Sequence, residues 1–281
     1  MTAGALSKES LPPRAPRKHQ TQLGKRLKFA WTSGIRELRK RFEDSLLGGL
    51  WLFLGPALLI GVYWAVFDLV VGIEFTDPRT GNAVPFLAAF AVGFFLYLTF
   101  SEMIGSSANW FKSKRRLVRE SDLPVWTIFA SLTARVFIQF LFYIAIVLIV
   151  CWSYGLATVQ GSLLYVASSL LVFWVFAGFG LVTAYLGTFF GDVKEIVPVI
   201  MRILFYTSSI TFPLSLVPET FRWIPLINPL TWPVEMMRDL LLWDAHNWMQ
   251  FLGPIFLIGL AIWSIALFFH WRLAPRLADI V

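Results

Sequence analysis

Six apolar segments, each long enough to cross a bilayer, constrain the fold of this chain more than any other feature. About 20 apolar residues in a helix cross the ~30 Å hydrocarbon core. Inside lipid the backbone has no water to bond, so only helices and closed barrels span it. We therefore predict an all-α integral membrane protein with six transmembrane helices. The predicted spans are residues 46–71, 86–104, 125–152, 163–190, 199–217 and 251–271.

The composition agrees with this class. Hydrophobic residues make up 57% of the chain, charged residues only 15%, and the mean hydropathy is +0.68, whereas soluble domains carry about 25% charged residues. Cys151 is the single cysteine, and the three histidines lie far apart in the sequence. An intrachain disulfide is therefore excluded, and we predict no metal site.

The basic residues are distributed unevenly. If both termini are cytoplasmic, nineteen of the 24 Lys and Arg residues fall in inner segments and three in outer ones. This distribution follows the positive-inside rule. It predicts a multi-pass protein with both termini in the cytoplasm, and it explains the pI of about 9.7 without nucleic acid as a partner.

Three regions are predicted along the chain. Residues 1–22 are polar and proline-containing, which is typical of a disordered tail. In residues 23–45, apolar side chains recur every three or four positions between basic residues, so we expect an amphipathic helix on the lipid headgroups. Residues 46–281 form the six-span domain.

Prolines interrupt the stretch 191–244. Pro213, Pro218, Pro225, Pro229 and Pro233 follow one another closely, and each breaks a helix and frees backbone carbonyls. We interpret the stretch as re-entrant half-helices before the last span, because broken helices that line a cavity are typical of transporters. An ordinary external loop is the alternative.

Two inner segments carry mixed charge and could contact a cytosolic partner; solvated loops are the alternative. The loop after the second span contributes Lys114, Arg115, Arg116, Glu120 and Asp122, and the turn before the fifth contributes Asp192, Lys194 and Glu195.

Four charged residues fall within predicted spans. They are Asp68, Glu102, Arg135 and Arg202. Charges in lipid are costly and indicate function or pairing. Glu102 and Arg135 both lie toward the inner side and could form a buried pair. Structural pairing or snorkelling is the alternative to a functional role.

Nucleotide-binding and hydrolytic motifs are missing. The sequence has no GxxxxGK[ST] loop, no HExxH and no GxSxG. We predict that the chain is not an enzyme, and that any ATP hydrolysis occurs on another chain.

Three stretches resemble ABC-type polysaccharide and polyol-phosphate export permeases, a family of ABC type-2 exporters. They are RFEDSLLGGLWLFLGP (41–56), VKEIVPVIMRILFYTSSITFPLSLVPE (193–219) and INPLTWPVEMMRDLLL (227–242). The chain departs from the family at Gly191, where arginine is frequent, and at Ser209, where proline is frequent.

The resemblance implies a homodimer of six-span subunits in the bacterial inner membrane, driven by two separate ATP-binding subunits. ATP and magnesium would bind those subunits, and this chain would hold no cofactor. The amphipathic helix, with Arg36 and Arg41, and the loop after the second span would meet the ATPases. The substrate implied is a lipid-linked glycan of the capsule or O-antigen kind, and we expect periplasmic export components as further partners.

Aromatic rings in the interrupted stretch could line the substrate path or anchor the fold. We expect Phe212, Phe221, Trp223 and Trp232 to divide between these roles, with Trp232 on the path. Two competing functions are a permease for a drug or small lipid and a membrane-embedded enzyme acting on polyprenyl-linked sugars. The enzyme would need clustered carboxylates or histidines, which the sequence lacks.

Overall fold

The computed structural model describes residues 22–43, 45–77, 80–243 and 247–280, excluding the side chains of Ala278 and Asp279. The predicted disordered tail lies outside the described residues except for Gln22, where α1 begins.

The described chain is mostly helical, and its only strands form one short hairpin. The strands are β1 (Phe75–Thr76) and β2 (Ala83–Val84), paired antiparallel with Phe75 opposite Val84. The helices are α1 (Gln22–Lys40), α2 (Trp51–Trp64), α3 (Phe86–Ser107), α4 (Trp110–Ser113), α5 (Arg115–Glu120), α6 (Val125–Ser153), α7 (Val159–Phe189), α8 (Val193–Thr207), α9 (Trp223–Ile227), α10 (Thr231–Leu242), α11 (Met249–Leu273) and α12 (Leu277–Ile280).

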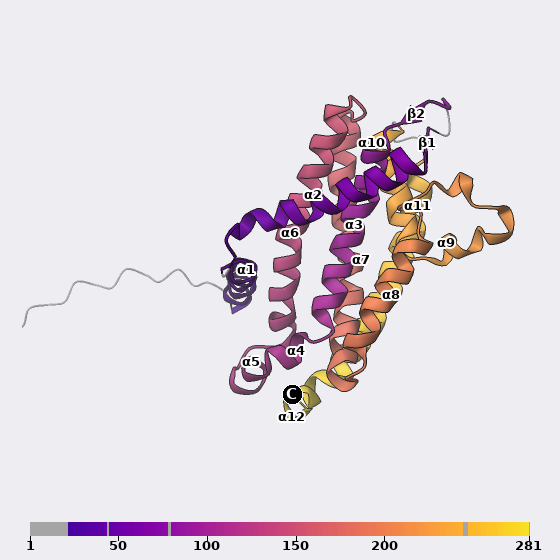
Figure 1. Cartoon of the computed structure of the whole chain (residues 1–281). Helices are drawn as coiled ribbons and strands as arrows, with labels where there is room; N and C mark the ends of the chain where they lie inside the picture. Colours follow the sequence, from indigo (N-terminus) through magenta and orange to yellow (C-terminus); the bar gives the residue numbers. More distant parts are fainter. Residues whose placement is uncertain (1–21, 44, 78–79, 244–246, 281) are drawn as a thin grey trace, which may run out of the picture.

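Five helical segments of the described chain are long and apolar enough to cross a membrane. They are Gly48–Val70, Phe86–Ser107, Val125–Ser153, Val159–Phe189 and Met249–Arg276. Figure 1 shows α3, α6 and α7 running together through the molecule, with α4, α5 and α12 at one end and the hairpin at the other. We call these ends the α5 end and the hairpin end.

The remaining predicted span, residues 199–217, corresponds to α8, which begins earlier than predicted and ends at Thr207, ten residues before the predicted end. Its 15 residues extend about 22 Å at 1.5 Å per residue. The chain continues without helix through Ser208, Ser209 and Ile210, all fully buried. Contacts described below supply the hydrogen bonds that this part of the backbone would otherwise lack.

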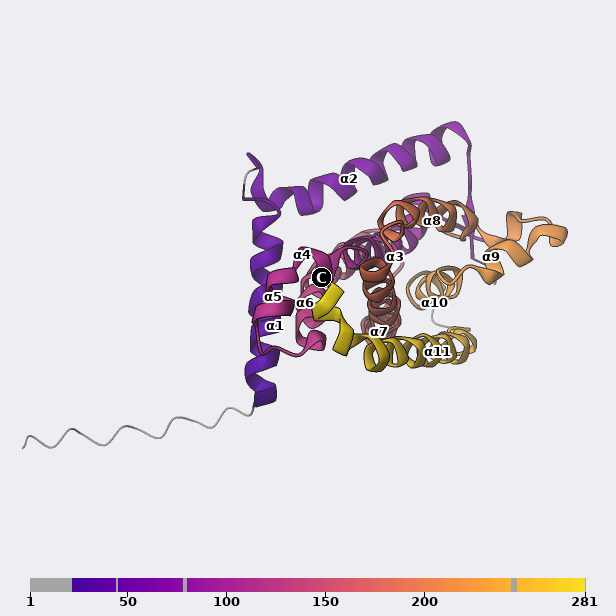
Figure 2. The same cartoon turned by 90° about the horizontal axis from the view of Figure 1, so that it is seen from below.

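Helix α2 stands apart from the other spans. It crosses the bundle at a steep angle in Figure 1 and lies outside it in Figure 2. In the most apolar 18 residues of the segment Gly48–Val70, only 11% of the residues are buried, whereas the corresponding fraction for α3 is 72%. A helix that is apolar all round and exposed within one chain needs lipid or another subunit as its neighbour.

Helix α1 packs tightly across α6 at Gly34. A Cβ atom added at Gly34 would lie 2.9 Å from Cβ of Ala134 and 2.9 Å from the backbone nitrogen of Arg135. Only glycine permits so close an approach. Helix α1 also exposes Leu27, Trp31 and other apolar side chains, as expected for a helix beside lipid. Helix α1 is therefore fixed to the bundle.

The proline-interrupted stretch forms short pieces. Two 3-10 turns, Leu214–Leu216 and Glu219–Phe221, precede α9. Helix α10 is buried along almost its whole length and packs against α3, α7 and α11. Pro225 lies within α9 and Pro233 within the first turn of α10, and α10 is enclosed by protein.

Candidate functional site

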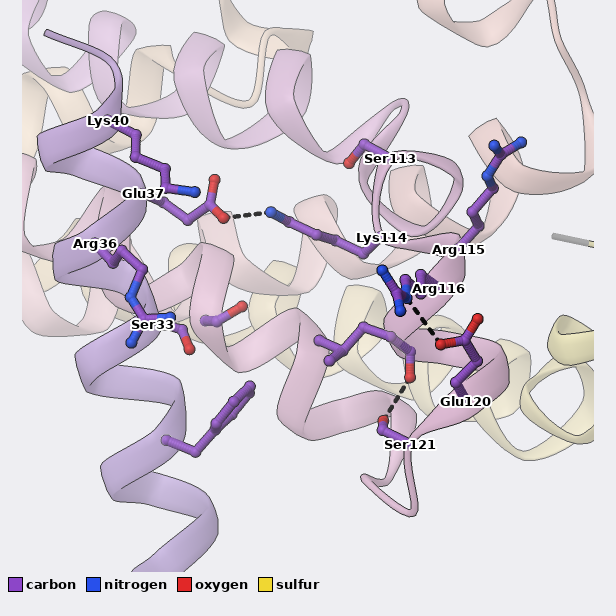
Figure 3. A pocket seen from close by; sticks show the side chains of 13 residues that line it. Ser33, Arg36, Glu37, Lys40, Ser113, Lys114, Arg115, Arg116, Glu120 and Ser121 are labelled. Carbon is purple, nitrogen blue, oxygen red and sulfur yellow. Dashed lines mark hydrogen bonds and ion pairs between the residues drawn. The ribbon is translucent and has the colours of Figure 1, made fainter. Parts of the chain in front are cut away.

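A cleft of about 620 Å³ opens at the α5 end between α1 and the α4–α5 segment (Figure 3). We call it the basic cleft, because five basic side chains and two carboxylates line it. Its lining residues are Phe29, Ser33, Arg36, Glu37, Lys40, Ser113, Lys114, Arg115, Arg116, Leu117, Glu120, Ser121 and Ser131.

Both carboxylates of the basic cleft are already paired. Lys114 Nζ donates to Glu37 Oε1, and Arg116 Nε lies 2.8 Å from Glu120 Oε2. Among the described residues, no ion pair joins Arg36, Lys40 or Arg115 to a carboxylate. The cleft therefore presents uncompensated positive charge and suits an acidic partner.

The α4–α5 segment is held firmly to the bundle. Trp110 Nε1 donates to the carbonyl of Ile128 on α6 at 3.0 Å, and Lys114 lies 4.9 Å from the centre of the Trp110 ring. On α7, a Cβ atom added at Gly187 would lie 1.9 Å from the Ala108 carbonyl oxygen. A displacement of this segment must therefore move α6 and α7 as well.

An ion cluster beside the cleft connects Arg41, which directly follows α1, to α3 and α6. Glu102 accepts from Arg41 Nη1 at 3.0 Å and from Arg135 Nη1 at 2.9 Å. Ser106 Oγ donates to Glu102 at 2.9 Å and accepts from Arg135 Nη2 at 2.7 Å. The structure thus contains the Glu102–Arg135 pair suggested by the sequence and adds Arg41. Breaking such a buried pair typically costs about 3–5 kcal/mol.

The basic cleft unites five of the predicted partner-contact residues: Arg36, Lys114, Arg115, Arg116 and Glu120. Arg41 lies in the adjoining ion cluster.

The remaining predicted contact residues lie outside the cleft lining. They are Asp122, exposed after α5, and Asp192, Lys194 and Glu195, exposed at the start of α8. Sequence reasoning missed Glu37 and Lys40. Glu37 is the only acidic residue of α1, which was a usable signal for a specific pair.

The other two charges predicted within spans, Asp68 and Arg202, do not belong to the ion cluster of Glu102. Asp68 lies in a π-helical turn, Ala65–Val70, at the end of α2, and Arg202 is exposed on α8.

At the hairpin end, Arg238 of α10 joins four segments. Its side chain is fully buried and donates to the carbonyls of Ala89 (3.0 Å), Ser209 (2.6 Å) and Ile210 (2.9 Å). It also pairs with Glu235 at 3.0 Å, and its guanidinium lies 4.6 Å from the centre of the Phe75 ring. Arg238 therefore satisfies the backbone carbonyls where α8 has stopped.

Asn228 provides further hydrogen bonds to the backbone at the end of α8. Its Nδ2 donates to the Leu204 carbonyl at 2.8 Å and to Thr207 Oγ1 at 2.9 Å, at the last turn of α8. Its Oδ1 accepts from the backbone nitrogen of Leu230 at 2.9 Å, beside the start of α10. Asn228 and Arg238 thus explain how irregular backbone is tolerated beside membrane spans.

The four predicted path rings lie in different surroundings. Phe212 is half-buried, while Phe221 and Trp223 are exposed. Trp232 Nε1 donates to the Leu226 carbonyl at 2.9 Å, and its ring packs edge-on against Phe251 at 6.1 Å. These two contacts hold the Trp232 ring against its neighbours, and its role on the path stays a prediction.

A larger set of rings, missed by the sequence reasoning, forms a column between α2, α3 and α8. Successive members contact one another at centroid distances of 4.7 to 6.3 Å. We call this the aromatic column; its members are Tyr63, Phe67, Phe86, Phe90, Phe94, Tyr97, Phe205 and Tyr206. Its α3 members recur every three or four residues, a signal that the sequence did contain.

Comparisons with known proteins agree with a transport role. The sequence model of the ABC-2 type transporter family matches residues 29–242. The O-antigen export system permease protein RfbA of Klebsiella pneumoniae is 24% identical over 88% of this chain and 92% of its own length. The polysialic acid transport protein KpsM of Escherichia coli is 26% identical over 73% of this chain and 78% of its own.

Proposed function

Because the chain belongs to the ABC-2 type transporter family, we propose that it is the membrane subunit of an ATP-driven exporter of a lipid-linked polysaccharide. The polymer is of the capsule or O-antigen kind, and the membrane is the bacterial inner membrane. The names and coverage of the relatives favour this substrate over a drug or a small lipid. Two separate ATPase subunits supply the energy, and ATP and magnesium bind there.

The basic cleft is the observation that carries this proposal. In the proposed orientation the α5 end is cytosolic, so the uncompensated charge of Arg36, Lys40 and Arg115 faces an ATPase subunit. Force applied there reaches α6 and α7 through Trp110 and Ala108. It reaches α3 through the ion cluster of Glu102.

The proposed architecture is a homodimer of six-span subunits. Helix α8, with the buried residues that follow it, counts as the fifth span, and α10 as a re-entrant half-helix. The second copy covers the exposed face of α2. The aromatic column then lies beside the contact between the copies, where its rings give a sugar chain several weak stacking positions, as movement requires.

The coupling role is tested by charge reversal in the basic cleft. Arg115→Glu combined with Arg116→Glu should insert normally, lose copurification with the ATPase and stop export, because an acidic partner would now be repelled. Lys25→Glu combined with Arg26→Glu is the matched control, since it makes the same change in charge outside the cleft lining. Wild-type copurification and export by the Arg115/Arg116 variant would refute the proposal.

A further inference from the structure

A second cavity, of about 390 Å³, lies between α2, the α5-end half of α3 and the middle of α6. It shares no lining residue with the basic cleft. One wall is apolar and includes Trp51, Leu52 and Leu59 of α2. The opposite wall is polar and contains Arg41, Ser101, Glu102, Gln139 and Tyr143. We call it the α2 cavity.

Gln139 gives the α2 cavity an unfilled hydrogen bond. Its side chain is 6% exposed, and its Nε2 donates to Tyr143 Oη at 2.6 Å. Its Oε1 is buried and has no hydrogen-bond partner within the described part of the chain. Turning the amide over would leave the nitrogen unpaired instead. A ligand hydroxyl satisfies either arrangement, because it both donates and accepts.

The charges of the cavity suit an anion next to that hydroxyl. Glu102 lies between Arg41 and Arg135, so this cluster is net positive. The Arg41 side chain is 46% exposed and lines the cavity. Tyr143 accepts from Gln139, which leaves its own proton available to an anionic oxygen.

If α1 lies on the lipid headgroups, as its sequence pattern predicts, the cavity lies near the boundary between headgroups and acyl chains. Helix α1, the amphipathic helix, crosses α6 at Ala134 and Arg135. Gln139 lies about 6 Å further along α6, at 1.5 Å per residue. A polar wall at this depth, opposite an apolar wall, accommodates an amphiphile.

We propose that the α2 cavity binds the headgroup of one lipid of the leaflet at the α5 end, an anionic headgroup that carries hydroxyl groups. The hydroxyl pairs with Gln139, the phosphate faces Arg41 and Tyr143, and the chains lie along α2. A membrane phospholipid and a lipid-linked sugar phosphate share this chemistry. Binding of a lipid-linked sugar phosphate rests on the proposed export function, whereas binding of a membrane phospholipid does not.

Two variants test the site in purified full-length protein. Gln139→Met removes the amide at nearly constant volume. Gly55→Trp fills the cavity, and a Cβ atom added there would meet no other atom within 4 Å, so the fold should tolerate it. The matched controls are Gln160→Met, exposed at the start of α7, and Gly61→Trp, equally open on α2 but outside the cavity lining.

Native mass spectrometry then counts bound lipid during titration with phosphatidylglycerol, phosphatidylcholine and a polyprenyl diphosphate N-acetylglucosamine. The wild type and both controls should bind one phosphatidylglycerol or sugar lipid per chain in preference to phosphatidylcholine. Gln139→Met should weaken this binding about tenfold, as expected for one lost hydrogen bond, and Gly55→Trp should abolish it.

The two lipids distinguish the sources. Site-dependent binding of the sugar lipid, with displacement of phosphatidylglycerol, identifies the substrate headgroup. Binding of phosphatidylglycerol alone identifies a resident lipid. Unchanged binding in both cavity variants, or no preference over phosphatidylcholine, overturns the proposal. The measurement involves neither ATPase nor export, so failure of the export function would be seen separately.

Discussion

Replacing Arg238 by methionine should destabilise the hairpin end, because one guanidinium donates to four acceptors there. The substitution leaves the Ser209 and Ile210 carbonyls buried without their donor, and each unpaired carbonyl costs about 1–3 kcal/mol. It also leaves Glu235 largely buried without its cation, and breaking a buried pair costs about 3–5 kcal/mol. These terms share one side chain and do not add. We expect the free energy of unfolding of Arg238→Met to be about 4–5 kcal/mol lower than that of the wild type.

The assay is the thermal unfolding of purified protein in detergent. At about 2–4 °C per kcal/mol for a chain of this size, the midpoint for Arg238→Met should fall by roughly 10 °C or more. Arg238→Lys keeps the charge but cannot reach all the carbonyls. Its midpoint should therefore lie between those of the wild type and Arg238→Met. Arg222→Met is the control, since Arg222 is half-exposed and lies 3.9 Å from an exposed Glu219. An exposed pair contributes about 0–1 kcal/mol. Equal midpoints for the Arg238→Met and Arg222→Met variants would refute the reasoning.

Three further outcomes are expected. Gly187→Leu should prevent accumulation of folded protein, because its Cβ would overlap the backbone of Ala108, just before α4. Gly191→Leu, where the added side chain meets open space, should accumulate normally. Fluorescence-detected size-exclusion chromatography compares the amounts of folded protein. In a cysteine-free background, a cysteine at Thr158 should react with an impermeant thiol reagent outside intact cells, and one at Ser113 should not; labelling at Ser113 contradicts the orientation. Trp232→Ala should reduce folded protein but not surface polymer per folded transporter, and reduced polymer per transporter would instead place the ring on the path.

Much of the fold could be predicted because spans are long and their apolar signal is strong. Five of the six predicted spans correspond to helices of membrane-crossing length. The end of α8 was misplaced by ten residues, because apolar residues continue through Leu216 after the helix has stopped. The contacts that hold the chain where the helix stops are tertiary. From 20 or more residues away, Asn228 bonds the Leu204 carbonyl in the last turn of α8, and Arg238 bonds the Ser209 carbonyl beyond it. A sequence read locally does not reveal such contacts.

The site was predicted in outline for the same reason. The charges of the α4–α5 segment were visible as a run, so Lys114, Arg115, Arg116 and Glu120 were identified. That Glu37 of α1 binds Lys114 depends on how α1 crosses α6, which only the packing at Gly34 determines. The aromatic column likewise forms only because α2, α3 and α8 meet. The sequence could have predicted its α3 members alone, because they recur every three or four residues.

The exposure of α2 bears on how the chain is made. Within one chain this helix rests on few protein neighbours, so it can leave the translocation machinery and dissolve in lipid unaided. Eleven basic residues precede it, and by the positive-inside rule we expect them to keep its first end on the cytosolic side. We therefore expect the first span to insert and take its orientation without help from α3, α6 and α7, whose buried faces need one another.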